Sequence, residues 1–168
     1  KIMKNVLILG GFGFIGTNLI EELLKRDFYR IFVFEFKGVL NRFGERITVF
    51  YGDYNNTEDL EYVFKNYKID IVFHLISTTV PATSNDNLEY DVESNLVGSI
   101  RLLKIMVKHN VQKLVFLSSG GTVYGRVSVN EVDEHQHTNP ISAHGITKLC
   151  IEKYIQLHHH LHGLNYII

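Results

Sequence analysis

The sequence predicts a doubly wound α/β domain, in which a parallel sheet carries helices on both faces. Short apolar runs alternate along the chain with segments whose apolar residues recur at helical spacing. A glycine-rich run, Gly10-Gly11-Phe12-Gly13-Phe14-Ile15-Gly16, follows the first apolar run directly and opens a helical pattern. An acidic residue, Glu35, ends the second apolar run about 20 residues further on. Together these observations predict parallel strands in the order 3-2-1-4-5-6.

The expected strands are short and rich in β-branched and aromatic residues, as buried parallel strands are. In chain order they cover Asn5–Leu9, Arg30–Glu35, Ile47–Tyr51, Asp70–Leu75, Lys113–Ser118 and Asn165–Ile168. Helices are expected between them over Phe14–Arg26, Thr57–Asn66, Asn87–His109 and Ser142–His162. Thr57 is the expected N-cap of the second helix. The whole chain, 1–168, is thus expected to be one dinucleotide-binding domain that stops within its sixth strand, with the substrate domain largely absent.

Composition excludes several classes of protein. The chain has 168 residues, enough for one domain with a real core. A net charge of −1 gives no support for nucleic-acid binding. The one cysteine, Cys150, has no partner for an internal disulfide and is expected to be a small packing residue. No apolar run is long enough to span a membrane and no signal peptide is recognisable, so a cytoplasmic location is expected.

Each glycine of the first turn has a mechanical task in binding a dinucleotide. Gly10 permits the tight turn, Gly13 lets the backbone approach a pyrophosphate, and Gly16 lets the helix pack on the strand. The helix N-terminus offers unpaired N–H groups to the anion. The alternative is a tight turn that binds nothing.

The acidic residue after the second apolar run favours NAD as the cofactor. Glu35 can accept hydrogen bonds from a ribose 2′-hydroxyl and would repel the 2′-phosphate of NADP. Lys37 and Arg42 lie close by in the sequence and keep NADP open as the less favoured alternative.

Ligands of such sheets collect beyond the carboxyl ends of the strands, and polar residues follow those ends. Asp53 and the backbone after it could bracket an adenine ring, or Asp53 could serve only the turn. Hydroxyl-rich turns follow the fourth and fifth strands at 74–79 and 118–125. His144 and Lys148 are one helical turn apart and therefore point the same way.

These stretches resemble the cofactor-binding part of an extended short-chain dehydrogenase/reductase, in the nucleotide-sugar epimerase and dehydratase branch that includes UDP-glucose 4-epimerase. The resemblance covers essentially the whole chain in family order. It rests on GGFGFIG at 10–16, Asp53, HLIS at 74–77, Asn95 in NLVGSIRLL, SSGGTVYG at 118–125 and HGITKLCIEKY at 144–154.

The resemblance implies a Rossmann fold, NAD as cofactor and a nucleotide-sugar substrate. In the family a hydride passes to the nicotinamide of NAD while a tyrosine takes the hydroxyl proton, and an epimerase returns the hydride to the other face of the keto sugar. The cofactor-binding residues it implies, together with those argued above, are Gly10, Gly13, Phe14, Ile15, Gly16, Glu35, Asp53, Tyr54, Leu75, Ile76, Ser77, Asn95, Ser118 and Lys148.

Two departures from the family pattern bear on catalysis. The family tyrosine falls on His144, while Lys148 is retained. The charge of Lys148 would favour a neutral imidazole, which is shorter than a phenol and reaches less far toward a substrate hydroxyl. The family serine or threonine falls on Gly120, so Ser119 or Thr122 would have to supply the hydroxyl. We therefore expect catalysis to be impaired or absent. The alternatives are that His144 acts as a substitute base, or that the histidine is a sequence variant.

The remaining polar candidates receive plainer interpretations. His158 and His162 are spaced like metal ligands, but no further ligand completes a set, and histidines suit a helix C-terminus, so no metal is expected. His74 is expected to end a buried strand. Asn95 is either a solvated helix residue or, by resemblance, a residue that orders the active-site end of its helix.

The leading hypothesis is the NAD-binding part of a nucleotide-sugar 4-epimerase-like enzyme that turns over sugar poorly. A non-catalytic cofactor-binding or assembly module is the first alternative. A reductase or dehydratase of the same family is the second, although the turn Gly120-Gly121-Thr122 lacks the acidic residues expected of a dehydratase. By resemblance, a homodimer is expected through the helices at 87–109 and 142–162.

Overall fold

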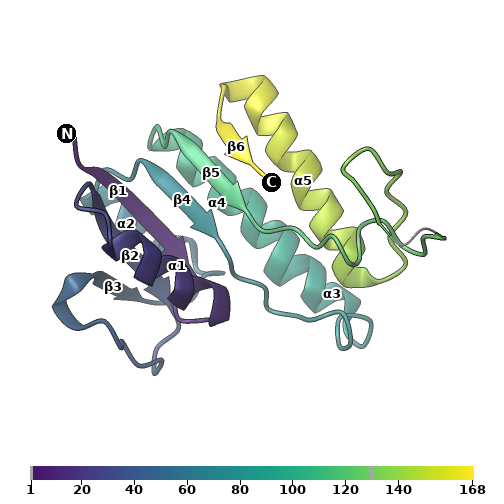
Figure 1. Ribbon diagram of the computed structural model, residues 1–168, viewed down its shortest axis with the longest axis horizontal. Coiled ribbons are helices and arrows are strands. Elements are labelled where there is room, and N and C mark those ends of the chain that lie inside the picture. Colours follow the sequence, from purple (N-terminus) through teal and green to yellow (C-terminus); the bar gives the residue numbers. More distant parts are fainter. Residues whose placement is uncertain (1, 129–130) are drawn as a thin grey trace.

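The computed structural model describes residues 2–128 and 131–168, which form a single six-stranded sheet between helices (Figure 1). The sheet order is β3-β2-β1-β4-β5-β6, and every neighbouring pair is parallel. This is the predicted doubly wound arrangement, and the strand order 3-2-1-4-5-6 is confirmed.

The strands lie close to their predicted positions. They are β1 (Lys4–Leu9), β2 (Tyr29–Glu35), β3 (Thr48–Tyr51), β4 (Ile71–His74), β5 (Lys113–Phe116) and β6 (Asn165–Ile167). β4 and β5 end one or two residues earlier than expected, at His74 and Phe116. The residues after them turn away at the carboxyl edge, where the polar loops of the site begin.

The helices are α1 (Phe14–Leu24), α2 (Thr57–Asn66), α3 (Leu88–Asp91), α4 (Gly98–Lys108) and α5 (Ala143–His162), with a short 3₁₀ turn η1 (Gly44–Arg46). The helix expected over Asn87–His109 is not uniform, because a π-helical stretch, η2 (Val92–Val97), separates α3 from α4. π-Helical turns insert an extra residue and are frequent at functional sites. Hydrophobic spacing alone gave no sign of this one.

The expected N-cap of α2 is wrong by one residue. Asn56 is extended, at φ −85° and ψ 116°, and its side-chain oxygen accepts hydrogen bonds from the N–H groups of Glu58 and Asp59 at 2.9 and 3.3 Å. Thr57 is the first helical residue. Asparagine is at least as good an N-cap as threonine, so composition could not separate the two neighbours.

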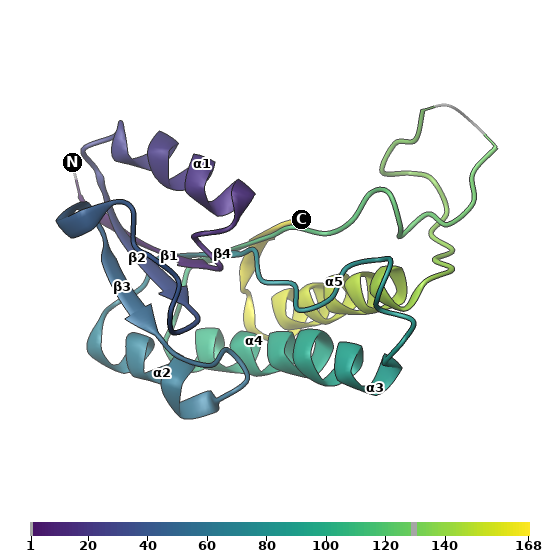
Figure 2. The same ribbon diagram turned by 90° about the horizontal axis from the view of Figure 1, so that it is seen from below.

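Alternate residues of the strands feed two cores on opposite faces of the sheet. Val6, Ile8, Val33 and their neighbours pack against α1, whereas Leu7, Leu9 and Phe34 pack with α2, α4 and α5. Figure 2 shows this division, with α1 on one side of the sheet and α2, α4 and α5 on the other. Residues 6–9 of β1 are fully buried, and burying each such aliphatic side chain contributes about 1.5–3 kcal/mol.

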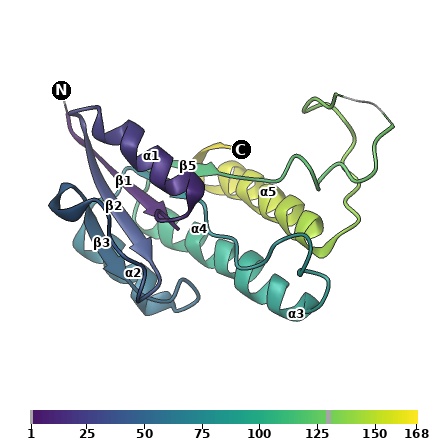
Figure 3. The same ribbon diagram turned by 60° about the horizontal axis from the view of Figure 1, so that its bottom comes forward.

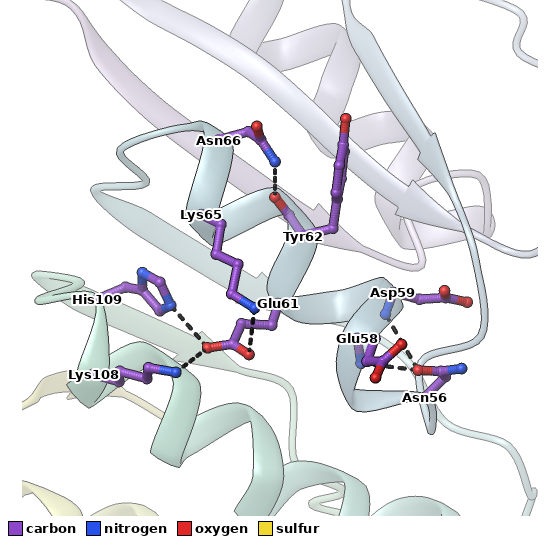
Figure 4. Close-up of polar contacts among 9 residues, drawn as sticks. All are labelled: Asn56, Glu58, Asp59, Glu61, Tyr62, Lys65, Asn66, Lys108 and His109. Carbon is purple, nitrogen blue, oxygen red and sulfur yellow. Dashed lines mark hydrogen bonds and ion pairs between the residues drawn. The ribbon is translucent and has the colours of Figure 1, made fainter.

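An ion-pair cluster ties α2 to the end of α4 (Figure 4). The carboxylate of Glu61 on α2 contacts Lys108 Nζ at 2.5 Å and His109 Nε2 at 3.2 Å, and Lys65 Nζ at 3.3 Å. The pKa of Glu61 falls to about 2, chiefly because Lys108 and then His109 donate hydrogen bonds to the carboxylate. Glu61 therefore stabilises the folded chain only while it is ionised.

We expect Glu61→Gln to lower the melting temperature Tm near pH 7, with a deficit that shrinks in acid. The ionised carboxylate contributes its full stabilisation above its unfolded pKa, near 4.5, and loses it as the pH falls through about 2. Melting curves of both proteins from pH 7 to pH 2 measure this. Glu21→Gln, an exposed change on α1, is the control. A deficit that stays constant down to pH 2 would contradict this role for Glu61.

Candidate functional site

The glycine turn after β1 lies in close backbone contact with the first turn of α1. Gly10 has φ +78°, in the left-handed region that favours glycine, and its N–H donates to Phe34 O at 3.0 Å. A Cβ on Gly16 would lie 2.5 Å from Gly11 O, so no side chain fits there. The N-cap of α1, Gly13, has no side-chain capping bond, and no acidic residue lies in the first turn. The helix therefore presents its N-terminal N–H groups and positive dipole end to an anion.

Glu35 lies across the mouth of this turn. Its Oε2 accepts a hydrogen bond from Phe12 N and its Oε1 one from Phe36 N, both at 3.1 Å. These two bonds hold the carboxylate between the glycine turn and the end of β2. Glu35, the acidic residue singled out in the sequence, therefore lies beside the glycine turn.

Two adjoining hollows of about 360 and 410 Å³ form a cleft at the carboxyl edge of the sheet. They share Phe36, Thr78 and Tyr90 as walls. Of the residues predicted from sequence, those lining the first hollow are Gly10, Gly13, Glu35, Tyr54, Leu75, Ile76 and Ser77, and Asp53 lines the second. Phe14 and Ile15 start α1 beside the turn, with 87% and 52% of their surfaces exposed. The structure thus brings together most of the residues predicted for a dinucleotide.

Asp53 also serves its own turn, as the alternative interpretation proposed. Its Oδ1 accepts a hydrogen bond from Asn55 N at 2.8 Å, and its N–H donates to Asp59 Oδ2 at 2.9 Å. The side chain remains exposed at the wall of the second hollow. Turn formation and ligand contact are therefore compatible at this residue.

A buried polar chain runs beneath the cleft. Tyr54 OH lies 3.1 Å from His74 Nε2, which lies 2.8 Å from Ser99 Oγ, and Ser99 Oγ donates to Asn95 O at 2.6 Å. Burial raises the pKa of Tyr54. The pKa of His74 falls to about 3, mostly because of burial and then because of the charge of Lys148. His74 ends β4 inside the core, as predicted, and stays neutral.

Asn95 continues this chain to the loop after β4. Its Oδ1 accepts a hydrogen bond from Thr78 N at 2.9 Å, and its Nδ2 donates to Thr79 Oγ1 and Asp91 Oδ1, both at 3.1 Å. Only 6% of Asn95 is exposed, so the interpretation as a solvated helix residue is wrong. The π-helical stretch η2 carries Asn95, and its side chain fixes the loop that forms one wall of the cleft.

The N-terminus of α5 is held by side chains from its own cap and from the loop after β4. Ser142 Oγ accepts a hydrogen bond from Gly145 N at 3.2 Å. Ser84 Oγ accepts one from His144 N at 3.1 Å, and Asn85 Oδ1 accepts one from Ala143 N at 2.9 Å. Loop 80–86 and α5 are therefore fastened to each other at the turn that carries His144.

His144 and Lys148 are both buried, with 8% and 7% of their surfaces exposed. Lys148 Nζ donates to Leu117 O at 2.9 Å and lies 4.7 Å from the centre of the Phe116 ring. Burial lowers the pKa of Lys148 to about 8, and Asp91 acts against this shift. The pKa of His144 is also lowered, first by burial and only second by Lys148. The neutral imidazole predicted from the sequence therefore has burial as its main cause.

The turn after β5 lies against the first turn of α5. A Cβ on Gly145 would be 2.7 Å from Thr122 O, so this glycine permits the contact. Thr122 Oγ1 donates to Ser119 O at 3.3 Å, and both residues are half-buried. Ser118 instead donates to Glu152 and lines a separate hollow beside β6, so the structure does not bring it into the cleft.

Beyond this turn the described residues 126–128 and 131–138 make an excursion away from the sheet, visible in Figure 3. Its base is narrow, because Asn139 N donates to Val123 O at 3.0 Å. Gly125 there has φ +70°, and a Cβ on it would lie 1.9 Å from Asn139 O. The two ends of the excursion therefore meet beside Thr122.

The histidines at the end of α5 serve the helix itself. His158 Nδ1 lies 2.8 Å from Tyr154 O, and His159 Nδ1 lies 3.0 Å from Leu164 O. Within residues 2–128 and 131–168, no group of three or more His, Cys, Asp or Glu side chains could hold a metal ion. No helix in the same residues is long and apolar enough to cross a membrane.

Comparison with known proteins agrees with this geometry. Residues 6–168 match the family model described as the NAD dependent epimerase/dehydratase family. A putative UDP-glucose 4-epimerase of Methanocaldococcus jannaschii is 32% identical over 164 residues, which is 97% of this chain and 53% of that protein.

Solved structures give the same result. UDP-glucose 4-epimerases of Thermotoga maritima, with UDP-glucose, and of Thermus thermophilus, with NAD, are each 30% identical to this chain. Both superpose with a TM-score of 0.89 over 96% of this chain and 53% of theirs. The chain therefore spans about half the length of the relatives that it matches.

Proposed function

The chain belongs to the NAD-dependent epimerase/dehydratase family, and from this we propose that it binds NAD as the cofactor-binding part of a nucleotide-sugar 4-epimerase-like protein. The observation that carries the proposal is the close approach of α1 at Gly16 to the backbone of the glycine turn, with the uncapped helix N-terminus at Gly13 lining the cleft. A dinucleotide needs this open backbone for its pyrophosphate. The relatives solved with NAD and with UDP-glucose support the same assignment.

The chain's own residues divide the work of holding NAD. The N–H groups at the start of α1 receive the pyrophosphate, and Glu35 accepts hydrogen bonds from the ribose hydroxyls. The charge of Glu35 repels the 2′-phosphate of NADP, so NAD is the preferred form. Bound NAD supplies the hydride acceptor for sugar oxidation.

The proton chemistry of the proposed reaction rests on α5. Lys148 supplies positive charge, and by family position it hydrogen-bonds the nicotinamide ribose. His144 occupies the place of the family base, but it is a neutral, buried imidazole shorter than a phenol. General-base catalysis needs reach to the substrate hydroxyl before pKa matters. We therefore propose that NAD binding is retained and that epimerase turnover is impaired.

The hydroxyl that polarises the sugar oxygen is proposed to come from Thr122. Gly120, at the family position, has no side chain, whereas the Thr122 backbone lies against Gly145 in the first turn of α5. Ser119 is the alternative donor on the same turn. A non-catalytic cofactor-binding module remains the competing function, because it would retain the glycine turn and tolerate the histidine.

We expect calorimetric titration of the chain with NAD to show binding that is at least several-fold tighter than binding of NADP. Two glycine variants locate the site. Gly13→Ala adds a Cβ 3.6 Å from Gly10 O, an ordinary contact, so Tm should change little while NAD affinity falls by roughly 10-fold or more.

Gly16→Ala is the matched variant for the fold. It adds a Cβ 2.5 Å from Gly11 O, so it should destabilise the chain by about 1–3 kcal/mol in denaturant unfolding, in addition to weakening NAD. Absence of NAD binding by the unmodified chain would refute the proposed function. Equal NAD affinity in Gly13→Ala would place the pyrophosphate elsewhere.

The proposed impairment is tested by His144→Tyr in a chimera that joins this chain to the C-terminal half of the Methanocaldococcus jannaschii relative. Restoring the phenol should raise UDP-glucose 4-epimerase turnover by roughly 100-fold or more, the usual contribution of a positioned acid–base group. NAD content is compared first, to establish that both chimeras retain cofactor. Equal turnover at equal NAD content would mean that His144 acts as the base or that the position is not catalytic.

We also propose a homodimer through α4 and α5. α5 presents an apolar stripe at helical spacing, formed by Ile146, Tyr154, Leu157 and Leu161, which are 38–60% exposed. Sedimentation should give a dimer for the chain and a monomer for Leu157→Glu, whereas Arg26→Glu, an exposed change just after α1 on the other side of the sheet, should leave the dimer largely intact. A monomeric unmodified chain would exclude this contact.

A further inference from the structure

A buried carboxylate that the sequence did not single out connects the loop after β4 with α5. Asp91, at the end of α3, is completely buried and accepts hydrogen bonds from three different segments. Thr79 Oγ1, in the loop after β4, and Asn95 Nδ2 at 3.1 Å both donate to Oδ1. Thr147 Oγ1 on α5 donates to Oδ2 at 2.5 Å. These three hydrogen bonds give the Asp91 carboxylate the donors that a buried carboxylate requires.

The contact with Thr147 places this carboxylate beside the two residues of proposed function on α5. Thr147 is the neighbour of Lys148 in the chain and lies one turn from His144. Lys148 is itself buried, and its Nζ has a carbonyl and an aromatic ring as its contacts, which offer no full negative charge. Asp91 raises the pKa of both Lys148 and His144 against the effect of burial. Two buried opposite charges stabilise each other far more than they would in water.

The other charged and titratable groups around Lys148 come from two elements, β4 and α5. His74 on β4 is neutral, and His144 on α5 has a lowered pKa. Glu152 follows Lys148 by one turn of α5, and Ser118 donates a hydrogen bond to it. Asp91 is thus the carboxylate on the cleft side of α5 that acts on both Lys148 and His144.

Asp91 also closes the buried chain beneath the cleft. Asn95 donates to Asp91 and, through its main-chain oxygen, accepts from Ser99, which leads by way of His74 to Tyr54. Tyr54 lines the first hollow of the cleft. One continuous set of hydrogen bonds therefore connects that hollow with the helix that carries Lys148.

We propose that Asp91 is the positioning residue of this site: through Thr147 it holds the first turns of α5 against the cleft, and it places a negative charge near Lys148 and His144. The proposal rests on the proposed function, since it takes Lys148 to be a cofactor contact. It adds a residue that acts through Lys148 and His144 without touching the ligand.

Asp91→Asn tests the charge at constant shape. An asparagine oxygen can accept from Thr79 and Asn95, and the Thr147 hydroxyl can turn to accept from the new amide. The first readout is the pKa of His144, which needs no cofactor and is measured from the NMR signal of its Cε1–H. His144→Gln identifies that signal. In Asp91→Asn this pKa should fall below its value in the unmodified chain. Asp86→Asn, an exposed change in the same loop region, should leave it unchanged.

The second readout is the pH dependence of NAD affinity by calorimetry. Affinity of the unmodified chain should fall as the pH rises through about 8, the pKa of Lys148, because the ammonium group loses its charge. In Asp91→Asn the midpoint should move lower by about 1, the usual effect of removing a nearby opposite charge. A merely structural role would lower Tm and leave both the His144 pKa and this midpoint in place.

Thr147→Val keeps the charge and removes the hydrogen bond to α5, so it tests positioning even where Asp91→Asn does not fold. It should weaken NAD binding several-fold without moving the midpoint, and Thr147→Ser should restore affinity. An unchanged His144 pKa in folded Asp91→Asn, or wild-type NAD affinity in Thr147→Val, would overturn the proposal. Absence of NAD binding by the unmodified chain would instead refute the proposed function, while the His144 titration would still report on Asp91.

Discussion

The arrangement of the cleft depends on the need to satisfy a buried carboxylate. Asp91 has no access to water, and a buried acceptor without donors costs several kcal/mol. Its donors must therefore converge on it from the loop after β4, from η2 and from α5. This convergence brings together segments that are far apart in the sequence, because Thr79 and Thr147 both donate to Asp91. Lys148 directly follows Thr147 in α5, so the contact between Thr147 and Asp91 also helps to hold Lys148 in place.

The π-helical stretch explains how one helix can serve both the core and this carboxylate. α4 buries Leu102, Leu103 and Met106 against the sheet, as a regular amphipathic helix does. Continuing that geometry backward without the extra residue would rotate α3 and η2 relative to α4. Asp91 and Asn95 are four residues apart and meet as on any helix, and the extra residue changes the direction of this pair relative to α4, so that both contact the loop after β4. The irregularity is therefore tied to the site and not to the core.

Sequence reasoning succeeded where the signal is local and failed where it depends on distant contacts. The glycine turn could be predicted from the positions of Gly10 to Gly16, and the strand order followed because this turn and Glu35 are typical of a dinucleotide-binding fold with that order. The N-cap at Asn56 was missed because two adjacent residues are both good caps. Asp91 was missed because an acidic residue in a helical pattern normally faces water, and only the fold shows that Thr147 meets it.

The contacts that hold the backbone of α5 differ from those that its side chain at position 144 could make, and this bears on the effect of a histidine there. The first turn of α5 is fixed by bonds to the main-chain N–H groups of Ala143, His144 and Gly145. These bonds form whatever side chain follows the backbone at 144, and the contacts of Lys148 and Thr147 lie further along the helix. Under the proposed function, an exchange at 144 would therefore change the group offered to a substrate, while the backbone bonds and the contacts of Lys148 do not depend on that side chain. Under the proposed function, cofactor binding and proton transfer depend on different residues. Loss of proton transfer at position 144 therefore gives no physical reason for loss of NAD binding.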